Sequence, residues 1–198
     1  MIYQIIEDCS PFYIRFTHPG IEQVINYCNI HTPQLREMAR PFVHHVLPIV
    51  NASKILEMTP LSKQLSLILG RVSLFMSKPG LYYRAHKDGL KCRISLNYTT
   101  QILDDKCITS WYSDDDLKNY LIDTLNGVSR ECVGFKKNLH LPIKTMTAKP
   151  NECILFNTDI FHDWDNTQSD NYRVVLTLHL TNPGDVYFDD VKKLLFNL

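Results

Sequence analysis

Apolar and polar residues alternate at the start of the chain and then repeat at helical spacing. Two short alternating runs, from Ile2 to Ile6 and from Phe12 to Phe16, predict strands on either side of a break at Ser10-Pro11. Over residues 21–28 the apolar positions fall three or four apart, which is the spacing of one helix face. We therefore expect about residues 1–70 to be mostly helical and to support a sheet.

Two Thr-Pro pairs predict further helices in the same region. Thr32-Pro33 and Thr59-Pro60 each have the form of an N-cap followed by proline at the first helical position. The first predicted helix ends near Arg40, because Pro41 follows it. The second ends at Gly70, since glycine commonly follows the last helical turn.

The apolar spacing changes to two from residue 71 onwards, which predicts a sheet. Apolar side chains alternate with others at residues 72–76 and 94–98, and strand patterns return at about 151–156 and 172–181. Many short strands without regular strand–helix alternation favour a jelly roll over a parallel α/β sheet. We therefore predict a mainly β fold with flanking helices and a cupin-like jelly-roll core at about residues 71–181.

The segment at about residues 101–145 interrupts this strand pattern. It contains one set of helix signals, with Ser113 as N-cap, Asp116 as its capping-box partner and Gly127 as stop. We interpret the segment as an insert that forms a lid or side wall, and we expect a closing helix at about residues 186–196. A chain of 198 residues fits a single domain with one buried core.

Composition and charge exclude several classes of partner. The formal net charge is zero, so nothing indicates a nucleic-acid or anionic-membrane partner. No apolar run is long enough to span a bilayer, and the N-terminus lacks the regions of a signal peptide. Six scattered cysteines without a C-x-x-C pair favour free thiols in a reducing compartment. We expect a cytoplasmic protein that acts on a small molecule or peptide, in an oligomeric state that the sequence leaves open.

Candidate metal ligands stand in two places in the β region. In His86-x-Asp88 an extended chain would point the imidazole and the carboxylate to the same side. A third ligand, His162, follows the apolar run Cys153 to Phe156. Two histidines and one carboxylate leave three adjacent positions of an octahedron open, as at non-haem Fe(II) sites. Taken alone, residues 86–89 would also fit a turn after a strand-end histidine.

Three acidic neighbours of His162 are expected to be solvated or to fix its tautomer through hydrogen bonds: Asp159, Asp163 and Asp165.

Arg173 opens a strand-like run eleven residues after His162. One face of this run is apolar, whereas the other face is mixed and carries Arg173, Val175, Thr177 and His179. A mixed face of this kind indicates the interior of a barrel. A buried guanidinium needs an anionic partner, and a carboxylate suits its bidentate fork. His179 lies ~20 Å further along the strand and is interpreted as structural.

These motifs together resemble the Fe(II)/2-oxoglutarate-dependent dioxygenases. His86-x-Asp88, the distal His162 and Arg173 follow that superfamily's pattern, and the resemblance covers roughly residues 71–181. The tail around Asn166 and Tyr172-Arg173 is similar to the aspartyl/asparaginyl hydroxylase branch. The lead-in is similar to the prolyl-hydroxylase branch: Phe75-Met76-Ser77-Lys78-Pro79-Gly80-x-Tyr82-Tyr83-x-x-His86-x-Asp88.

The resemblance implies a fold, two cofactors and a role for each motif residue. The fold would be a double-stranded β-helix with flanking helices. His86, Asp88 and His162 would hold Fe(II), and Arg173 would bind the far carboxylate of the co-substrate 2-oxoglutarate. The reaction would hydroxylate an unactivated C–H bond and release succinate and CO2. Because Asp88 supplies the carboxylate, a halogenase, which leaves that position to a halide, is disfavoured.

Several substrates and one other class of protein stay open at this point. The two hydroxylase branches favour an amino acid, free or in a peptide or protein. Another small molecule or a nucleobase is the alternative, although the sequence has no basic stripe with interleaved aromatic residues. A non-catalytic jelly roll that binds a metal or small ligand, or an enzyme that uses another divalent ion, is the alternative from a different class.

Three further residues are candidates for lining the co-substrate pocket. Strand parity places Tyr82 on the side of His86, whereas the resemblance to prolyl hydroxylases places a pocket tyrosine at Tyr83. A bulge near Gly80 would change the parity. Asn97, in the strand that follows, is a candidate of the same kind.

Overall fold

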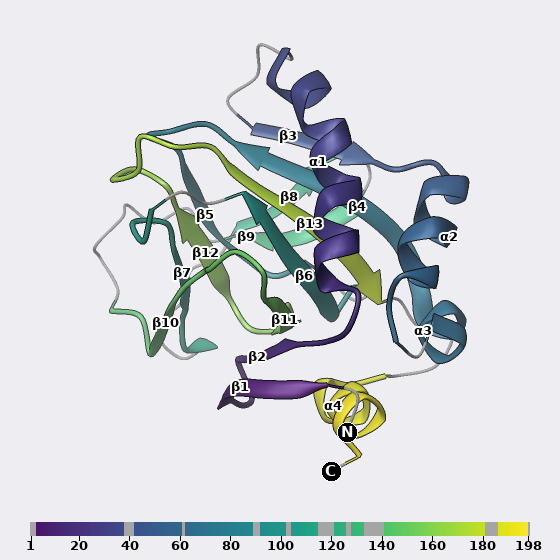
Figure 1. The fold of residues 1–198 in the computed structure, drawn as a ribbon. Helices are drawn as coiled ribbons and strands as arrows, with labels where there is room; N and C mark the ends of the chain where they lie inside the picture. The colour runs from purple at the N-terminus through teal and green to yellow at the C-terminus, as the bar shows by residue number, and fades with distance from the viewer. Residues whose placement is uncertain are drawn as a thin grey trace.

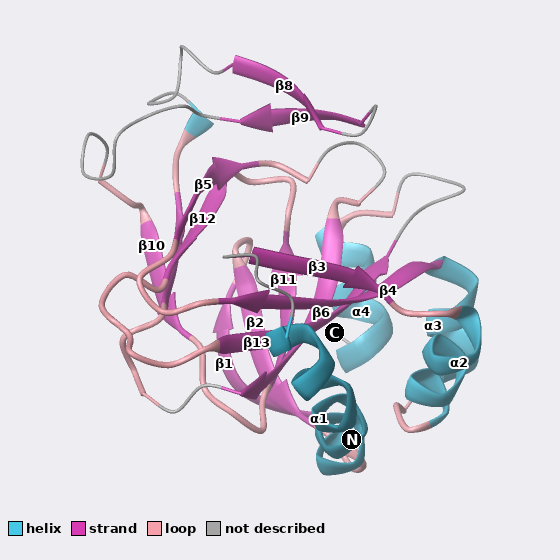
Figure 2. Cartoon of the chain, turned by 90° about the horizontal axis from the view of Figure 1, so that it is seen from above, coloured by secondary structure: helices cyan, strands magenta, loops and turns pink. Residues whose placement is uncertain are grey.

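The computed structural model describes residues 3–37, 42–60, 62–88, 92–101, 104–114, 121–125, 128–132, 141–180 and 186–197. In these parts the strands form two antiparallel sheets (Figures 1 and 2). The larger sheet runs in the order β1 (Gln4–Cys9), β2 (Tyr13–Thr17), β11 (Cys153–Asn157), β6 (Ile94–Gln101), β13 (Arg173–Leu180), β4 (Leu69–Ser77) and β3 (Phe42–Val46). The smaller sheet runs in the order β10 (Lys144–Thr147), β7 (Ile108–Trp111), β12 (His162–Asp165), β5 (Tyr82–His86), β9 (Val128–Cys132) and β8 (Leu121–Leu125). The predicted mainly β jelly roll, a double-stranded β-helix, is confirmed.

The main hydrophobic core lies between the larger sheet and the helices. The helices are α1 (Ile21–Glu37), α2 (Ile49–Glu57), α3 (Ser62–Ile68) and α4 (Phe188–Phe196), and α1 crosses one face of the sheet (Figure 1). The alternating positions of β4 face this core, since Val72, Leu74 and Met76 are at most 1% exposed. The residues between them on each strand therefore point to the other face, into the space between the sheets.

Aromatic side chains join the two sheets across that space. Tyr13 of β2 stacks on Trp111 of β7 with ring centroids 5.1 Å apart. Phe156 of β11 meets His162 of β12 edge to face at 4.8 Å. These contacts enclose His162 between the sheets, and His162 is 5% exposed.

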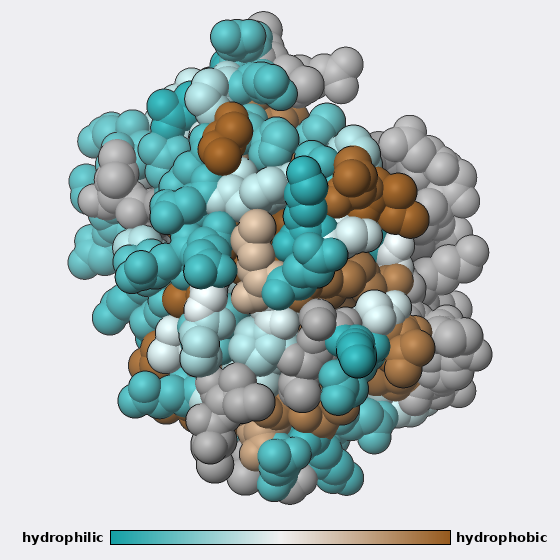
Figure 3. Space-filling model, turned by 45° about the vertical axis from the view of Figure 1, so that its right-hand side comes forward, coloured by the Kyte–Doolittle hydropathy of each residue, from teal (hydrophilic) through white to brown (hydrophobic). Residues whose placement is uncertain are grey.

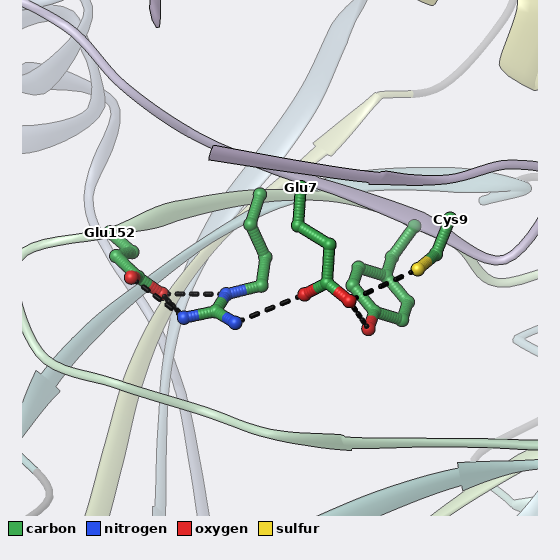
Figure 4. Close-up of polar contacts among 5 residues, drawn as sticks. Glu7, Cys9 and Glu152 are labelled. Atoms are coloured by element: carbon green, nitrogen blue, oxygen red, sulfur yellow. Dashed lines mark hydrogen bonds and ion pairs between the residues drawn. The ribbon is translucent and has the colours of Figure 1, made fainter. Parts of the chain in front are cut away.

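A polar network ties the N-terminal strands to the rest of the larger sheet (Figure 4). The guanidinium of Arg15 on β2 donates from Nε and Nη2 to Glu152, at 2.8 and 2.7 Å, and from Nη1 to Glu7 at 3.0 Å. Glu7 also accepts hydrogen bonds from the Tyr13 hydroxyl and the Cys9 thiol. One arginine thus joins β1, β2 and the segment that leads into β11.

Of two predicted helix boundaries in the first third, one is wrong and one agrees with the structure. α1 continues through Thr32-Pro33 to Glu37, so Thr32 is not an N-cap, and its hydroxyl donates to the Cys28 carbonyl at 3.3 Å. A buried stripe that runs from Ile21 to Leu35 holds the helix together across the proline. The second predicted helix exists as α3, and its end at Ile68, just before β4 begins at Leu69, agrees with Gly70 as the residue that follows the helix. β3 and α2 had no strong sequence signal and were missed.

Strands occupy much of the segment that was interpreted as an insert. β7, β8, β9 and β10 lie between residues 108 and 147, and all belong to the smaller sheet. The predicted helix from Ser113 to Gly127 is wrong over Leu121–Leu125, which pair with β9 as an antiparallel strand. Residues 115–120 and 126–127 lie outside the described residues. These strands are part of the smaller sheet rather than a separate addition to it.

The C-terminal helix and the free thiols agree with the sequence. α4 covers most of the predicted 186–196, and Asp190 accepts a hydrogen bond from the Tyr187 N–H at 2.9 Å, as in a capping box. Among the described residues, Cys9, Cys28, Cys92, Cys107 and Cys153 are free thiols. Within the same residues, no helix has the length and apolar character to cross a membrane.

Candidate functional site

Two histidines lie opposite each other on adjacent strands of the smaller sheet. His86 at the end of β5 and His162 at the start of β12 are register partners, and their ring centroids are 4.6 Å apart. His86 Nδ1 is 3.0 Å from the Arg84 carbonyl, and His162 Nδ1 is 2.9 Å from the Ile160 carbonyl. Because a carbonyl only accepts, Nδ1 is the protonated nitrogen in the neutral form of each ring, and Nε2 then has a lone pair for a metal.

Asp88 completes the predicted group of three ligands. Its Oδ1 is 3.4 Å from His86 Nε2, and one ligand atom each of His86, Asp88 and His162 lie within 4.8 Å of one another. Neighbouring ligands of one ion are about 3 Å apart when each bond is about 2.1 Å long. Small side-chain rotations would therefore close the three around a metal, and the structure brings the predicted ligands together.

Electrostatics prepare these side chains to bind a cation. Burial lowers the pKa of His162 to about 4, and the charge of His86 lowers it further, while Asp88 opposes the shift. Burial alone would raise the pKa of Asp88, but the hydrogen bond and charge of His86 and the charge of His162 hold it below its usual range. At neutral pH the site thus offers a carboxylate and a neutral His162 imidazole.

Asp163 has a different role from the one predicted. It is 2% exposed, and its Oδ2 accepts hydrogen bonds from the hydroxyls of Tyr82, at 2.9 Å, and Tyr112, at 2.6 Å. The prediction that Asp163 is solvated or fixes the His162 tautomer is wrong, because the Ile160 carbonyl holds His162. Asp159 is exposed, in agreement with a solvated loop residue.

A register shift between β5 and β12 places Tyr83, rather than Tyr82, on the side of His86. His162 pairs with His86 and Trp164 pairs with Tyr83, so three steps on β5 match two steps on β12. This bulge places Tyr83 beside His86, with ring centroids 4.9 Å apart, and stacks Tyr83 on Trp164 at 5.1 Å. The parity argument for Tyr82 is wrong, because the bulge lies after Tyr83 rather than near Gly80. A co-substrate role for Tyr83 stays a prediction.

Arg173 lies at the other end of these stacked rings. Its guanidinium carbon is 5.5 Å from the Trp164 ring centre, and its Nη2 is 3.4 Å from the Thr109 hydroxyl. The buried Nε has no hydrogen-bond partner, and no carboxylate pairs with Arg173, among the residues that the structure describes. A partly buried cation without an anion is costly, so this position suits an anionic ligand.

Three more polar atoms with no partner lie on the same inner face of the larger sheet as Arg173. They are Ser77 Oγ, Thr99 Oγ1 and Asn97 Oδ1, each buried and without a hydrogen-bond partner in the described parts of the chain. The register places Arg173 opposite Ser77, Val175 opposite Thr99 and Thr177 opposite Asn97. We call Arg173, Ser77, Asn97 and Thr99 the polar cradle.

The polar cradle fits an acidic ligand better than an apolar one. Arg173 offers a guanidinium, and Ser77 and Thr99 offer hydroxyl donors, so a carboxylate would satisfy atoms that are otherwise buried and unpaired. Of these residues the sequence predicted Arg173 and Asn97 but missed Ser77 and Thr99. The sequence did contain a signal for them. Ser77 and Thr99 are polar residues that alternate with the apolar residues of β4 and β6 that face the main core.

Comparison with known proteins finds solved structures of similar fold but no similar sequence. No family model matches the chain, and no curated protein sequence matches it. Among solved structures, HygX from Streptomyces hygroscopicus, with nickel and 2-oxoglutarate bound, has a TM-score of 0.53 at 7% identity and covers 86% of this chain and 82% of its own. A Pseudomonas putida prolyl-4-hydroxylase has a TM-score of 0.49 at 12% identity, covering 87% and 94%. SnoK, a non-haem α-ketoglutarate-dependent carbocyclase from nogalamycin biosynthesis, has 0.49 at 11%, covering 94% and 86%. At these identities the likeness to HygX shows the fold alone.

Proposed function

We propose that the protein is an Fe(II)- and 2-oxoglutarate-dependent oxygenase that hydroxylates an amino acid, free or in a peptide or protein. The observation that carries the proposal is the pairing of two features between the sheets. One is the group His86, Asp88 and His162, and the other is the partly buried Arg173 with no anionic partner among the described residues. Two stacked rings, Tyr83 and Trp164, connect them.

The side chains divide the work between the metal and the co-substrate. His86 and His162 would bind Fe(II) through Nε2, and Asp88 through its carboxylate, leaving adjacent positions for the co-substrate and O2. Arg173 would bind the far carboxylate of 2-oxoglutarate, helped by the hydroxyls of the polar cradle. Once bound, Fe(II) and 2-oxoglutarate supply the oxidation: O2, 2-oxoglutarate and a C–H bond give an alcohol, succinate and CO2.

The surroundings of the site would limit access of water. His86 and His162 are each 5% exposed, and Tyr83 and Trp164 form an aromatic wall between the metal group and Arg173. A dry site strengthens the attraction between Arg173 and a carboxylate and protects reactive intermediates from side reactions. The side chains thus bind, orient and shield, and the cofactors perform the redox chemistry.

The substrate class rests on the sequence resemblance. The lead-in over residues 75–88 is similar to prolyl hydroxylases, and the tail is similar to aspartyl/asparaginyl hydroxylases. We further propose that the protein works in the cytoplasm, since the described cysteines are free thiols, as in a reducing compartment. Its partners would be a small molecule or peptide rather than nucleic acid.

The test measures succinate released from 2-oxoglutarate in air, with and without Fe(II), over a panel of amino acids, peptides and nucleotides. We expect iron-dependent release that one class of substrate stimulates. His162→Ala and Arg173→Met should abolish it, whereas the matched charge control Arg36→Met, on the exposed end of α1, should not. Absence of both succinate release and 2-oxoglutarate binding to the iron-loaded protein would refute the proposal.

A further inference from the structure

We propose that Asp88, Cys92 and His179 form a second cation site, one that takes a thiophilic divalent ion such as Zn²⁺. One ligand atom from each of these residues lies within 4.8 Å of the other two. Asp88 is common to this group and to the group with His86 and His162. The inference uses the geometry alone and does not depend on the oxygenase reaction.

The two new ligands come from distant parts of the chain and are buried together. Cys92 precedes β6, and His179 lies near the end of β13 in the larger sheet. Cys92 Sγ is 2.9 Å from His179 Nδ1, and the two residues are 6% and 2% exposed. The inward position of His179 follows from strand parity, because Arg173, Val175 and Thr177 share its face.

Thr158 fixes the distance between Asp88 and Cys92. The Asp88 N–H donates to the Thr158 carbonyl at 3.3 Å, while the Thr158 hydroxyl donates to the Cys92 carbonyl. The Thr158 N–H also donates to the Arg93 carbonyl at 2.9 Å. Thr158 is 2% exposed, so a single buried residue hydrogen-bonds to both ligand-bearing backbones.

The donor set selects the kind of ion. A thiolate and an imidazole with one carboxylate are typical of Zn²⁺, and thiolates select thiophilic ions over Mg²⁺ or Ca²⁺. With about 2.3 Å to sulfur and about 2.0 Å to nitrogen, a tetrahedral zinc holds these two atoms about 3.5 Å apart. Cys92 and His179 would therefore separate slightly when the ion enters. The thiol proton is released to solvent as the metal–sulfur bond forms.

Sharing Asp88 gives the second site a consequence for the first. A carboxylate drawn to an ion at Cys92 and His179 is a weaker ligand to an ion between His86 and His162. A thiophilic ion would then lower iron affinity without displacing either of those two histidines. His179, which the sequence suggested to be structural, is assigned here as a ligand.

Cobalt(II) is the probe, because a thiolate bound to Co²⁺ gives a sulfur-to-metal charge-transfer band in the near ultraviolet. We expect Co²⁺ to produce this band in the wild-type protein and in His162→Ala, where the first group lacks a ligand. Cys92→Ser should remove the band, and the matched thiol control Cys9→Ser should keep it. Zn²⁺ added to the cobalt form should bleach the band.

Other outcomes would overturn the assignment. A wild-type protein and a His162→Ala variant that both bind cobalt without the band would do so, as would a band that survives Cys92→Ser. His179→Asn gives a second check that leaves the thiol in place. Here the affinity for Co²⁺, measured by following the band, should fall at least ~10-fold. Circular dichroism of each variant confirms folding. Because the band needs no co-substrate or oxygen, its absence would leave the proposed oxygenase function untouched.

Discussion

His86 and His162 are directly opposed residues of the antiparallel strands β5 and β12. Opposed residues point to the same face of a sheet, so the pairing alone brings two imidazoles to one side, with centroids 4.6 Å apart. A slip of one residue in this register would turn one ring to the opposite face. The metal group therefore depends on sheet register as much as on the identity of its ligands.

The first prediction concerns the metal group. His162→Ala should reduce Fe(II) affinity by at least ~100-fold, because it removes a metal ligand. Removing a residue that only hydrogen-bonds to a ligand usually lowers metal affinity by less than this. Isothermal titration under anaerobic conditions measures it. His31→Asn, on α1 and away from the sheets' interior, is the matched control and should bind as the wild type does. Equal affinities in all three proteins would contradict the assignment.

The second prediction concerns Arg173. Arg173→Lys keeps the charge but loses the fork, so affinity for 2-oxoglutarate should fall by ~10-fold or more, the scale of one charge-assisted hydrogen bond. Arg173→Met should be weaker still, while iron binding without 2-oxoglutarate should barely change. The readout is the Fe(II) charge-transfer band during anaerobic titration. Arg36→Met controls for the change of net charge, and wild-type affinity in Arg173→Met would refute the assignment.

The third prediction separates binding from stability at the polar cradle. Thr99→Val keeps the shape of a side chain that is 1% exposed and removes a buried hydroxyl with no partner among the described residues. The ligand-free protein should gain about 1 kcal/mol in free energy of unfolding, whereas affinity for 2-oxoglutarate should fall. Urea denaturation and the anaerobic titration measure the two effects. A loss of stability with unchanged affinity would show that Thr99 serves the fold alone.

The sequence predicted the parts of the fold that follow from one-sided burial. Val72, Leu74 and Met76 alternate because one face of β4 packs on the helices. The ligand types His86, Asp88 and His162 were readable because their chemistry is unusual in a strand region. Long-range packing decided the rest. The stripe from Ile21 to Leu35 carries α1 through Pro33, and pairing with β9 makes a strand of Leu121–Leu125 despite local helix signals.

Pocket details were harder to predict for a geometric reason. The bulge between Tyr83 and His86 reverses the parity on which the choice of Tyr82 rested, and no residue there marks it. Ser77 and Thr99 are ordinary strand residues until the register places Ser77 opposite Arg173 and Thr99 opposite Val175. Thr158, which follows β11, hydrogen-bonds to Asp88 and Cys92 in the segment between β5 and β6. Each of these relationships joins segments far apart in sequence.

The fourth prediction concerns the Arg15 network. Arg15→Met leaves Glu7 and Glu152 without their shared cation, and since the side chains of Arg15 and Glu152 are only 11% and 13% exposed, the cost should be about 2 kcal/mol. Lys192→Met breaks an ion pair to Asp8 nearer the surface and should cost less than about 1 kcal/mol. Urea denaturation of both variants decides. Equal losses would mean that the Arg15 network contributes no more than a surface pair.

The last prediction concerns pH and His18, which packs in the main core away from the metal group. His18 is 5% exposed, and its Nε2 is 3.0 Å from the Tyr98 hydroxyl. Burial lowers the pKa of His18, although its contact with the Pro19 carbonyl opposes the shift. In the unfolded chain the pKa of histidine is about 6.5, so below that pH the unfolded state takes up the proton first. The free energy of unfolding therefore falls as pH decreases below about 6.5 and levels off above it.

His162, whose pKa is also lowered, acts in the same direction, so the test compares the pH dependence of stability in the wild type with that in a His18 variant. Urea denaturation between pH 7.5 and 5.5 should give a shallower pH dependence for His18→Gln than for the wild type, whatever the stability of each at neutral pH. Parallel curves would show that His18 is protonated equally in the folded and unfolded states.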